Sequence, residues 1–98
     1  MSQLQATGPG RFSLLGALNL ETVTAIRRDG LRQLAGAVAG SLRVDLAAVT
    51  DVDSGGLAML VDWLAWANNA GRVLAYENPP PALLALARIS DVSALLSG

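Results

Sequence analysis

Two aspartates and a serine precede a pair of glycines in the segment V-T-D-V-D-S-G-G-L-A-M-L, residues 49–60. Ser54, between Asp53 and Gly55, could accept a phosphate, contact a partner, bind an anion or help to start a helix. The chain has no histidine and no cysteine, and all seven basic residues are arginines. Nothing is therefore placed to activate the serine hydroxyl, so the residues predict no catalytic site and a protein that is not an enzyme.

Nucleotide and metal binding are also disfavoured at this segment. A phosphate-binding glycine-rich loop normally has more glycines and a lysine, and both are missing here. The carboxylates of Asp51 and Asp53 would repel a nucleotide, and thiolate or imidazole metal sites are excluded by composition. We expect no cofactor and no bound metal. The local interpretation is that Asp53 or Ser54 caps a helix and that Gly55-Gly56 permits a tight turn, which is compatible with each functional alternative.

Composition narrows the classes of partner. The 98 residues carry a net charge of −1 with no basic stripe, so no nucleic-acid partner is expected. Hydrophobic residues make up 52% of the chain, yet no apolar run approaches the roughly 20 residues of a membrane span. The first ten residues lack the pattern of a signal peptide. We therefore expect a cytoplasmic chain without direct membrane insertion, whose apolar surplus is covered by a protein partner.

Alternating and helical patterns predict an α/β domain. The expected elements are strands at residues 4–6, 11–18, 42–49 and 73–77, helices from a cap at Asn19 to about 39, from about 55 to 70 and at about 82–89, and a short last element at 92–96. In the first helix the apolar positions are Val23, Ile26, Leu31, Leu34 and Val38. No linker or repeat interrupts the pattern. Residues 1–98 are therefore predicted to form a single domain, with a small mixed β-sheet packed against α-helices.

The second helix has two apolar faces at 100° per residue. Leu57, Leu60, Val61, Leu64 and Ala67 form one stripe, which is the predicted core face. Met59, Trp63, Trp66 and Ala70 form a second stripe on another side. The first helix could cover this second stripe, but tryptophan and methionine are also typical anchors of protein interfaces. We predict that the second stripe is a docking surface.

The segment L-R-V-D-L-A-A-V-T-D-V-D-S-G-G-L-A-M-L, residues 42–60, resembles the signature segment of STAS domains, the fold of the SpoIIAA-like anti-sigma factor antagonists. The resemblance is specific over residues 42–66 and extends in element order over residues 11–96. Within the family, Asp53-Ser54-Gly55-Gly56-Leu57 is most similar to the MlaB-like members. Those are cytoplasmic subunits of Mla-type ABC transporters, which move phospholipids between the membranes of Gram-negative bacteria.

This resemblance implies a partner. It predicts binding to an MlaF-like ATPase subunit, and through it to an MlaE-like permease at the cytoplasmic face of the inner membrane. The implied contact residues are Ser54 with its neighbours Asp53 and Gly55, extended by Met59, Trp63 and Trp66. The isolated chain could also form a homodimer through the aromatic stripe.

The alternative within the family is an anti-sigma factor antagonist controlled by serine phosphorylation. Those proteins carry Asp-Ser-Ser-Gly or Asp-Ser-Thr-Gly, and the second hydroxyl receives the phosphate. Asp53 and Ser54 match the first two positions, whereas the phosphoacceptor position is Gly55. The missing hydroxyl favours the transporter subunit, and phosphorylation at Ser54 stays open as the competing hypothesis.

Overall fold

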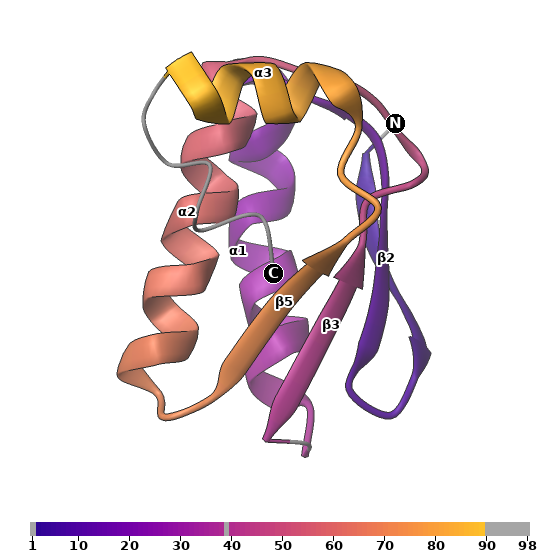
Figure 1. Ribbon diagram of the computed structural model, residues 1–98. Helices are drawn as coiled ribbons and strands as arrows, with labels where there is room; N and C mark the ends of the chain where they lie inside the picture. The colour runs from indigo at the N-terminus through magenta and orange to yellow at the C-terminus, as the bar shows by residue number, and fades with distance from the viewer. Residues whose placement is uncertain (1, 39, 90–98) are drawn as a thin grey trace.

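In the computed structural model the described part of the chain, residues 2–38 and 40–89, is a mixed β-sheet with two helices on one face and a third across one end (Figure 1). The strands are β1 (Gln3–Gly8), β2 (Arg11–Leu18), β3 (Ser41–Asp45), β4 (Val49–Val52) and β5 (Val73–Glu77). The helices are α1 (Leu20–Gly36), α2 (Ser54–Asn69) and α3 (Pro81–Ile89). None of the helices over these residues has the length and hydropathy that a membrane crossing needs.

Strand β2 organises the sheet because it pairs with three other strands. The sheet order is β1-β2-β3-β5, with β1 antiparallel to β2 and with β3 and β5 parallel to their neighbours. The first half of β2 pairs with β3, and its second half pairs with β4. The change of partner occurs at Gly16, which has φ +91° and lies at a shift in register. Glycine suits this position because a side chain is disfavoured at positive φ.

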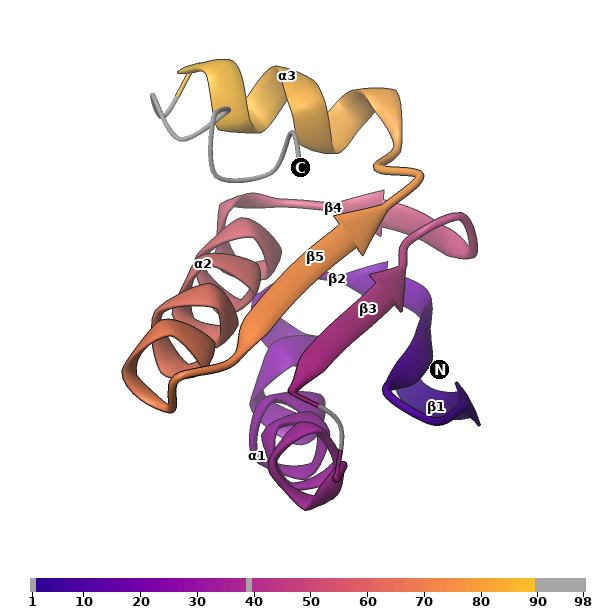
Figure 2. The same cartoon turned by 60° about the horizontal axis from the view of Figure 1, so that its bottom comes forward.

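Helices α1 and α2 cover one face of the sheet, and α3 crosses over the end at which the parallel strands finish (Figures 1 and 2). The strand residues that point toward the helices are buried: Phe12 and Leu14 from β2, Leu42 and Val44 from β3, and Leu74 and Tyr76 from β5. The alternation of strands therefore places one apolar face against the helices, which forms the core.

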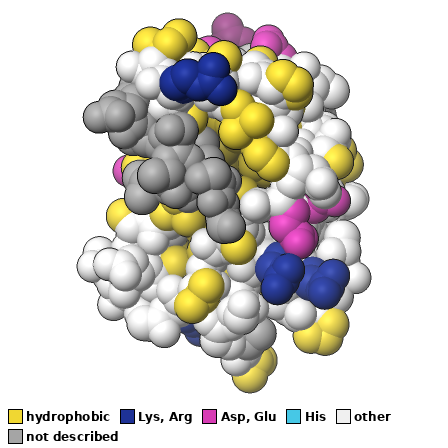
Figure 3. Space-filling view, viewed as in Figure 1, with side chains coloured by type: hydrophobic (Ala, Val, Ile, Leu, Met, Phe, Trp, Pro, Cys, Tyr) yellow, Lys and Arg dark blue, Asp and Glu magenta, His cyan; other side chains and the backbone are white. Residues whose placement is uncertain are grey.

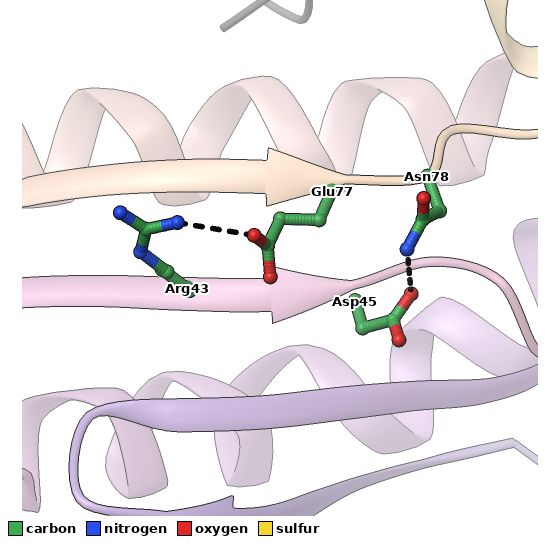
Figure 4. Close-up of polar contacts among 4 residues, drawn as sticks. All are labelled: Arg43, Asp45, Glu77 and Asn78. Carbon is green, nitrogen blue, oxygen red and sulfur yellow. Dashed lines mark hydrogen bonds and ion pairs between the residues drawn. The ribbon is translucent and has the colours of Figure 1, made fainter.

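The opposite face of the sheet carries polar and charged side chains. Arg43 of β3 forms an ion pair with Glu77 at the end of β5, with 3.1 Å between Nη1 and Oε2 (Figure 4). Asn78 donates a hydrogen bond of 3.1 Å from Nδ2 to Asp45 Oδ1. On the space-filling surface, basic and acidic side chains lie side by side in this region (Figure 3). These exposed pairs contribute little to stability.

Most of the predicted strands are confirmed. The alternating segments at residues 11–18 and 73–77 are strands with the predicted bounds, and the short first strand extends from Gln3 to Gly8. The predicted strand at 42–49 is wrong, because β3 stops at Asp45 and a separate strand, β4, begins at Val49. Asp45 Oδ1 accepts a hydrogen bond from Ala47 N at 2.9 Å, which turns the chain after β3. A short aspartate side chain commonly closes such turns.

The helices match the predicted order with shifted ends. Asn19 caps α1 as predicted, and Gly71 follows α2 with φ +70°. Helix α1 ends at Gly36, so Val38 is fully exposed outside it and not in its apolar stripe, as had been expected. The helix predicted to reach about residue 39 is therefore shorter than expected, and the predicted element at 92–96 lies outside the described residues.

Helices α1 and α2 approach each other closely where a glycine faces a tryptophan. Trp63 is 1% exposed, and a Cβ atom on Gly30 would lie 2.6 Å from Trp63 Cζ2 and 2.7 Å from Cη2. The absence of a side chain at position 30 is therefore what admits the indole between the helices. The role of Gly30 in packing depends on this long-range contact.

Gly30→Ala should destabilise the protein by about 1–3 kcal/mol, because the added methyl would overpack against the indole. This loss should appear although alanine favours a helix by up to about 1 kcal/mol over glycine. Gly36→Ala in the same helix is the matched control, since a Cβ there meets nothing within 4 Å. Denaturant unfolding of both variants tests the contact, and equal effects of the two substitutions would contradict it.

Tyr76 predicts a loss of stability at alkaline pH. Its hydroxyl donates a 2.7 Å hydrogen bond to Leu60 O, and burial raises the pKa of Tyr76 well above its ordinary value. In the unfolded chain the phenol ionises near pH 10. Above that pH the folded state holds more protons than the unfolded state, so the free energy of unfolding falls as pH rises.

The chain has no lysine, no cysteine and one tyrosine, so the phenolate absorbance reports this group alone. We expect no tyrosine titration near pH 10 until the protein unfolds. Tyr76→Phe should remove the tyrosine-linked fall in stability at high pH and cost about 1 kcal/mol at neutral pH. A normal titration in the folded protein would refute the assignment.

Candidate functional site

A single aspartate connects the starts of two helices at one end of the domain. Asp53 is the N-cap of α2, and its Oδ1 accepts hydrogen bonds from Gly55 N at 2.8 Å and Gly56 N at 3.1 Å. Its Oδ2 accepts a third hydrogen bond from Leu20 N, at 3.3 Å, in the first turn of α1. The predicted capping role of Asp53 is thus confirmed, and the same carboxylate also holds the start of α1.

The start of α1 has its own cap beside Asp53. Asn19 Oδ1 accepts hydrogen bonds from Glu21 N and Thr22 N, both at 3.0 Å. Thr22 Oγ1 in turn accepts a hydrogen bond from Asn19 N at 2.9 Å. This reciprocal arrangement satisfies backbone donors that a helix start leaves free. Each helix start thus has its own cap, and the Asp53 carboxylate joins the two starts.

The two glycines after Ser54 serve different contacts. Gly56 is buried against the end of β2, where a Cβ atom would lie 2.5 Å from Leu18 O. Because that neighbour is backbone, no side chain fits at position 56. Gly55 faces the side chain of Leu20, and its Cβ would lie 2.6 Å from Leu20 Cδ2. Two side chains thus obstruct position 55: Leu20 of the other helix and Asp53, whose Oδ1 would lie 3.1 Å from the Cβ.

Ser54 is the first residue of α2 and is exposed. Leu20 is 70% exposed although it is a large apolar residue. The exposed surface at this end thus combines the serine hydroxyl, the backbone of Gly55 and the side chain of Leu20. We name this set the helix-start surface: Leu20, Asp53, Ser54 and Gly55.

The prediction that Met59 and Trp63 form an exposed docking stripe is wrong. Met59 is 2% exposed and Trp63 is 1% exposed, and α1 covers the indole at Gly30. Leu57, Leu60 and Ala67 of the predicted core face are buried as predicted. Val61 and Leu64 are only half-buried, because α2 also turns Met59 and Trp63 inward. Within the described part of the chain, Trp63 Nε1 has no hydrogen-bond partner. Its burial is therefore driven by packing.

Trp66, the third member of that stripe, is half-buried and engaged within the fold. The guanidinium carbon of Arg72 lies 5.7 Å from the centroid of its ring, in a cation–π arrangement. Arg72 also donates a 2.9 Å hydrogen bond from Nη1 to Leu34 O near the end of α1. This pair fastens the end of α2 to the end of α1. The aromatic stripe that predicted a homodimer is therefore largely used inside the molecule.

Leu20 was missed because its sequence context says little about exposure. It follows the N-cap of α1 and stands three residues before Val23, a spacing that is typical of a buried stripe. Only its position in the first helical turn indicates that it can project beyond the sheet. Its contact with Gly55, 35 positions later in the chain, depends on how the two helices pack, which no local pattern contains.

The described residues contain no group of three or more acidic, histidine or cysteine side chains able to hold a metal ion. The carboxylate of Asp53 is already occupied by three backbone donors. Its arrangement is that of a structural cap that orders a surface.

The fold is similar to that of SpoIIAA, an anti-sigma factor antagonist. SpoIIAA in its unphosphorylated form superposes with a TM-score of 0.75 at 14% identity, covering 98% of this chain and 85% of that one. The phosphorylated form of the Bacillus cell fate determinant SpoIIAA gives 0.70 at 17% identity, covering 98% and 88%. The Mglu crystal structure gives 0.57 at 18% identity over 80% of this chain and 19% of that one.

Comparison of the sequence with family models identifies the family of this chain. The family model described as MlaB, STAS domain, matches residues 2–97, and the chain belongs to this family. No curated protein is significantly similar to the chain in sequence. The predicted STAS fold is therefore confirmed.

Asp53→Ala should destabilise the protein by about 1–2 kcal/mol, because three backbone N–H groups at two helix starts lose their acceptor. Asp53→Asn is the matched control. Its side-chain oxygen can still cap α2, and asparagine is as good an N-cap as aspartate. Thermal and denaturant unfolding should therefore rank the alanine variant well below the asparagine variant. Equal stabilities of the two variants would show that the cap is unimportant.

Proposed function

We propose that this protein is a non-catalytic STAS subunit that binds the ATPase of an Mla-type phospholipid ABC transporter. Through that ATPase it would lie at the cytoplasmic face of the inner membrane, beside an MlaE-like permease. Its role there is to support the assembly or activity of the transporter, and so the lipid asymmetry of the outer membrane. The match of the MlaB-type model over nearly the whole chain carries this proposal.

The helix-start surface supports the same proposal. Exposed groups of two helices lie together there, fixed by the Asp53 carboxylate, while the aromatic residues predicted for docking are largely used in the fold. A rigid surface loses little conformational freedom on association, which favours stable binding. It offers a partner the hydroxyl of Ser54 and the side chain of Leu20.

Phosphorylation of Ser54 is the second candidate function. The fold is similar to that of SpoIIAA, which has been solved in phosphorylated and unphosphorylated forms, and Ser54 is exposed at a helix start. A helix start favours a phosphate electrostatically. The position that carries the phosphoacceptor hydroxyl in anti-sigma factor antagonists is Gly55 here, and Leu20 lies against it. This geometry favours the transporter subunit.

Ser54→Arg should abolish co-purification with the ATPase subunit of the transporter, because a long charged side chain would stand in the middle of the helix-start surface. Ser41→Arg is the matched control, since Ser41 is also exposed but begins β3 at the opposite end of the domain (Figure 1). The measurement is pull-down from cells that express the tagged chain with the ATPase and permease.

Three results would count against the proposal or its interface. If the wild-type chain does not co-purify with the ATPase, the transporter function is wrong. If serine kinases add a phosphate to Ser54, detected by mass spectrometry and lost in Ser54→Ala, the anti-sigma factor antagonist function is favoured instead. Retention of the ATPase by Ser54→Arg would remove this end of the domain from the interface.

A further inference from the structure

Four large apolar side chains of the described residues are exposed: Leu20, Val38, Val73 and Ile89. Val38 and Ile89 adjoin residues that the structure does not describe, and Val73 begins the edge strand β5. Leu20 alone stands between two structured helix starts. A large apolar side chain that is fixed at such a position offers a partner an apolar contact that is already in place.

Leu20 is held in place from two sides. Its backbone N–H donates to Asp53 Oδ2 at 3.3 Å, which joins its main chain to the cap of α2. Its side chain lies over Gly55, so closely that a Cβ atom there would be 2.6 Å from Cδ2 and 3.0 Å from Cγ. The glycine at position 55 thus forms the shallow seat on which the leucine rests. An anchor that is ordered before binding loses less freedom when it is buried.

Two carboxylates adjoin the backbone of this anchor, and a third lies on the strand that pairs with the end of β2. Glu21 follows it in the first turn of α1 and is exposed, and Asp53 lies beneath it. Asp51 is exposed on β4, opposite Ala17 of β2, three residues before Leu20. An apolar centre with an acidic border is complementary to an apolar socket bordered by lysine or arginine.

We propose that Leu20 is the apolar anchor by which this chain binds the ATPase subunit, and that Gly55 is its seat. The ATPase is inferred to present an apolar socket with basic side chains around it. This inference rests on the proposed function and adds to it the residue on α1 that makes the contact. Leu20 and Gly55 then act as one unit, because any side chain at position 55 must displace the leucine.

The test measures the affinity of purified variants for the ATPase–permease assembly prepared without this chain. Leu20→Ala should weaken binding by about 30-fold, the effect of a central interface residue. Val73→Ala, which shortens another exposed apolar side chain, should bind like the wild type. Gly55→Ser should weaken binding by about tenfold through displacement of Leu20. The double variant Leu20→Ala with Gly55→Ser should then bind no more weakly than Leu20→Ala alone.

The acidic border gives an independent measurement. Glu21→Gln should lower mainly the association rate, and rising salt should weaken wild-type binding, because exposed charges steer the encounter. Far-UV circular dichroism and thermal unfolding establish that each variant is folded.

The outcomes separate the two levels of the proposal. If the wild-type chain binds and Leu20→Ala binds equally well, the anchor is wrong while the transporter function stands. If the effects of Leu20→Ala and Gly55→Ser multiply in the double variant, the two residues do not act as a unit. If the wild-type chain does not bind the assembly at all, both the function and the anchor are refuted.

Discussion

The contact between Gly30 of α1 and Trp63 of α2 decides how the two helices lie on the sheet. The indole enters the space that a side chain at position 30 would occupy, so α1 and α2 approach closely and share one apolar layer. The orientation of α2 that places Trp63 against α1 also buries Met59 and leaves Val61 and Leu64 half-buried. Arg72 then fixes the far ends of the helices by stacking on Trp66 and donating to Leu34 O. Packing of this kind tolerates little change of shape, so the helix pair is a rigid body.

The same pairing places the two helix starts side by side, where Asp53 can serve both. One carboxylate oxygen caps α2, and the other accepts from the first turn of α1. Gly56 allows α2 to begin directly against the end of β2, since any side chain would meet Leu18 O. The exposed groups of the helix-start surface are thus positioned by contacts that begin in the core. Ser54 and Leu20 project from a frame that their own side chains do not have to stabilise.

Local sequence patterns were sufficient to predict most of the helices and strands. They failed where contacts between distant residues determine which side chains are buried. Alternation located β2 and β5, and capping chemistry located the starts of both helices, because strand periodicity and caps depend on neighbours in sequence. The break after Asp45 was missed, since the apolar alternation continues to Leu46, which is itself fully buried beyond the end of β3. The burial of Trp63 could not be read from α2 alone. It depends on a glycine 33 residues earlier that looks, locally, like a defect in a helix.

The site was predicted in the same uneven way. Asp53 was identified because a cap is a local feature, whereas Leu20 acquires its importance from a contact between helices. The apolar surplus of the sequence suggested a broad aromatic docking face, yet the fold uses the largest of those side chains between α1 and α2. What remains exposed at the helix starts is one leucine, one hydroxyl and their acidic neighbours. An interface built on so small an apolar centre gains its strength from the accurate placement of an anchor and from complementary charge, since affinity does not follow from buried area alone. The rigid pairing of α1 and α2 supplies that placement.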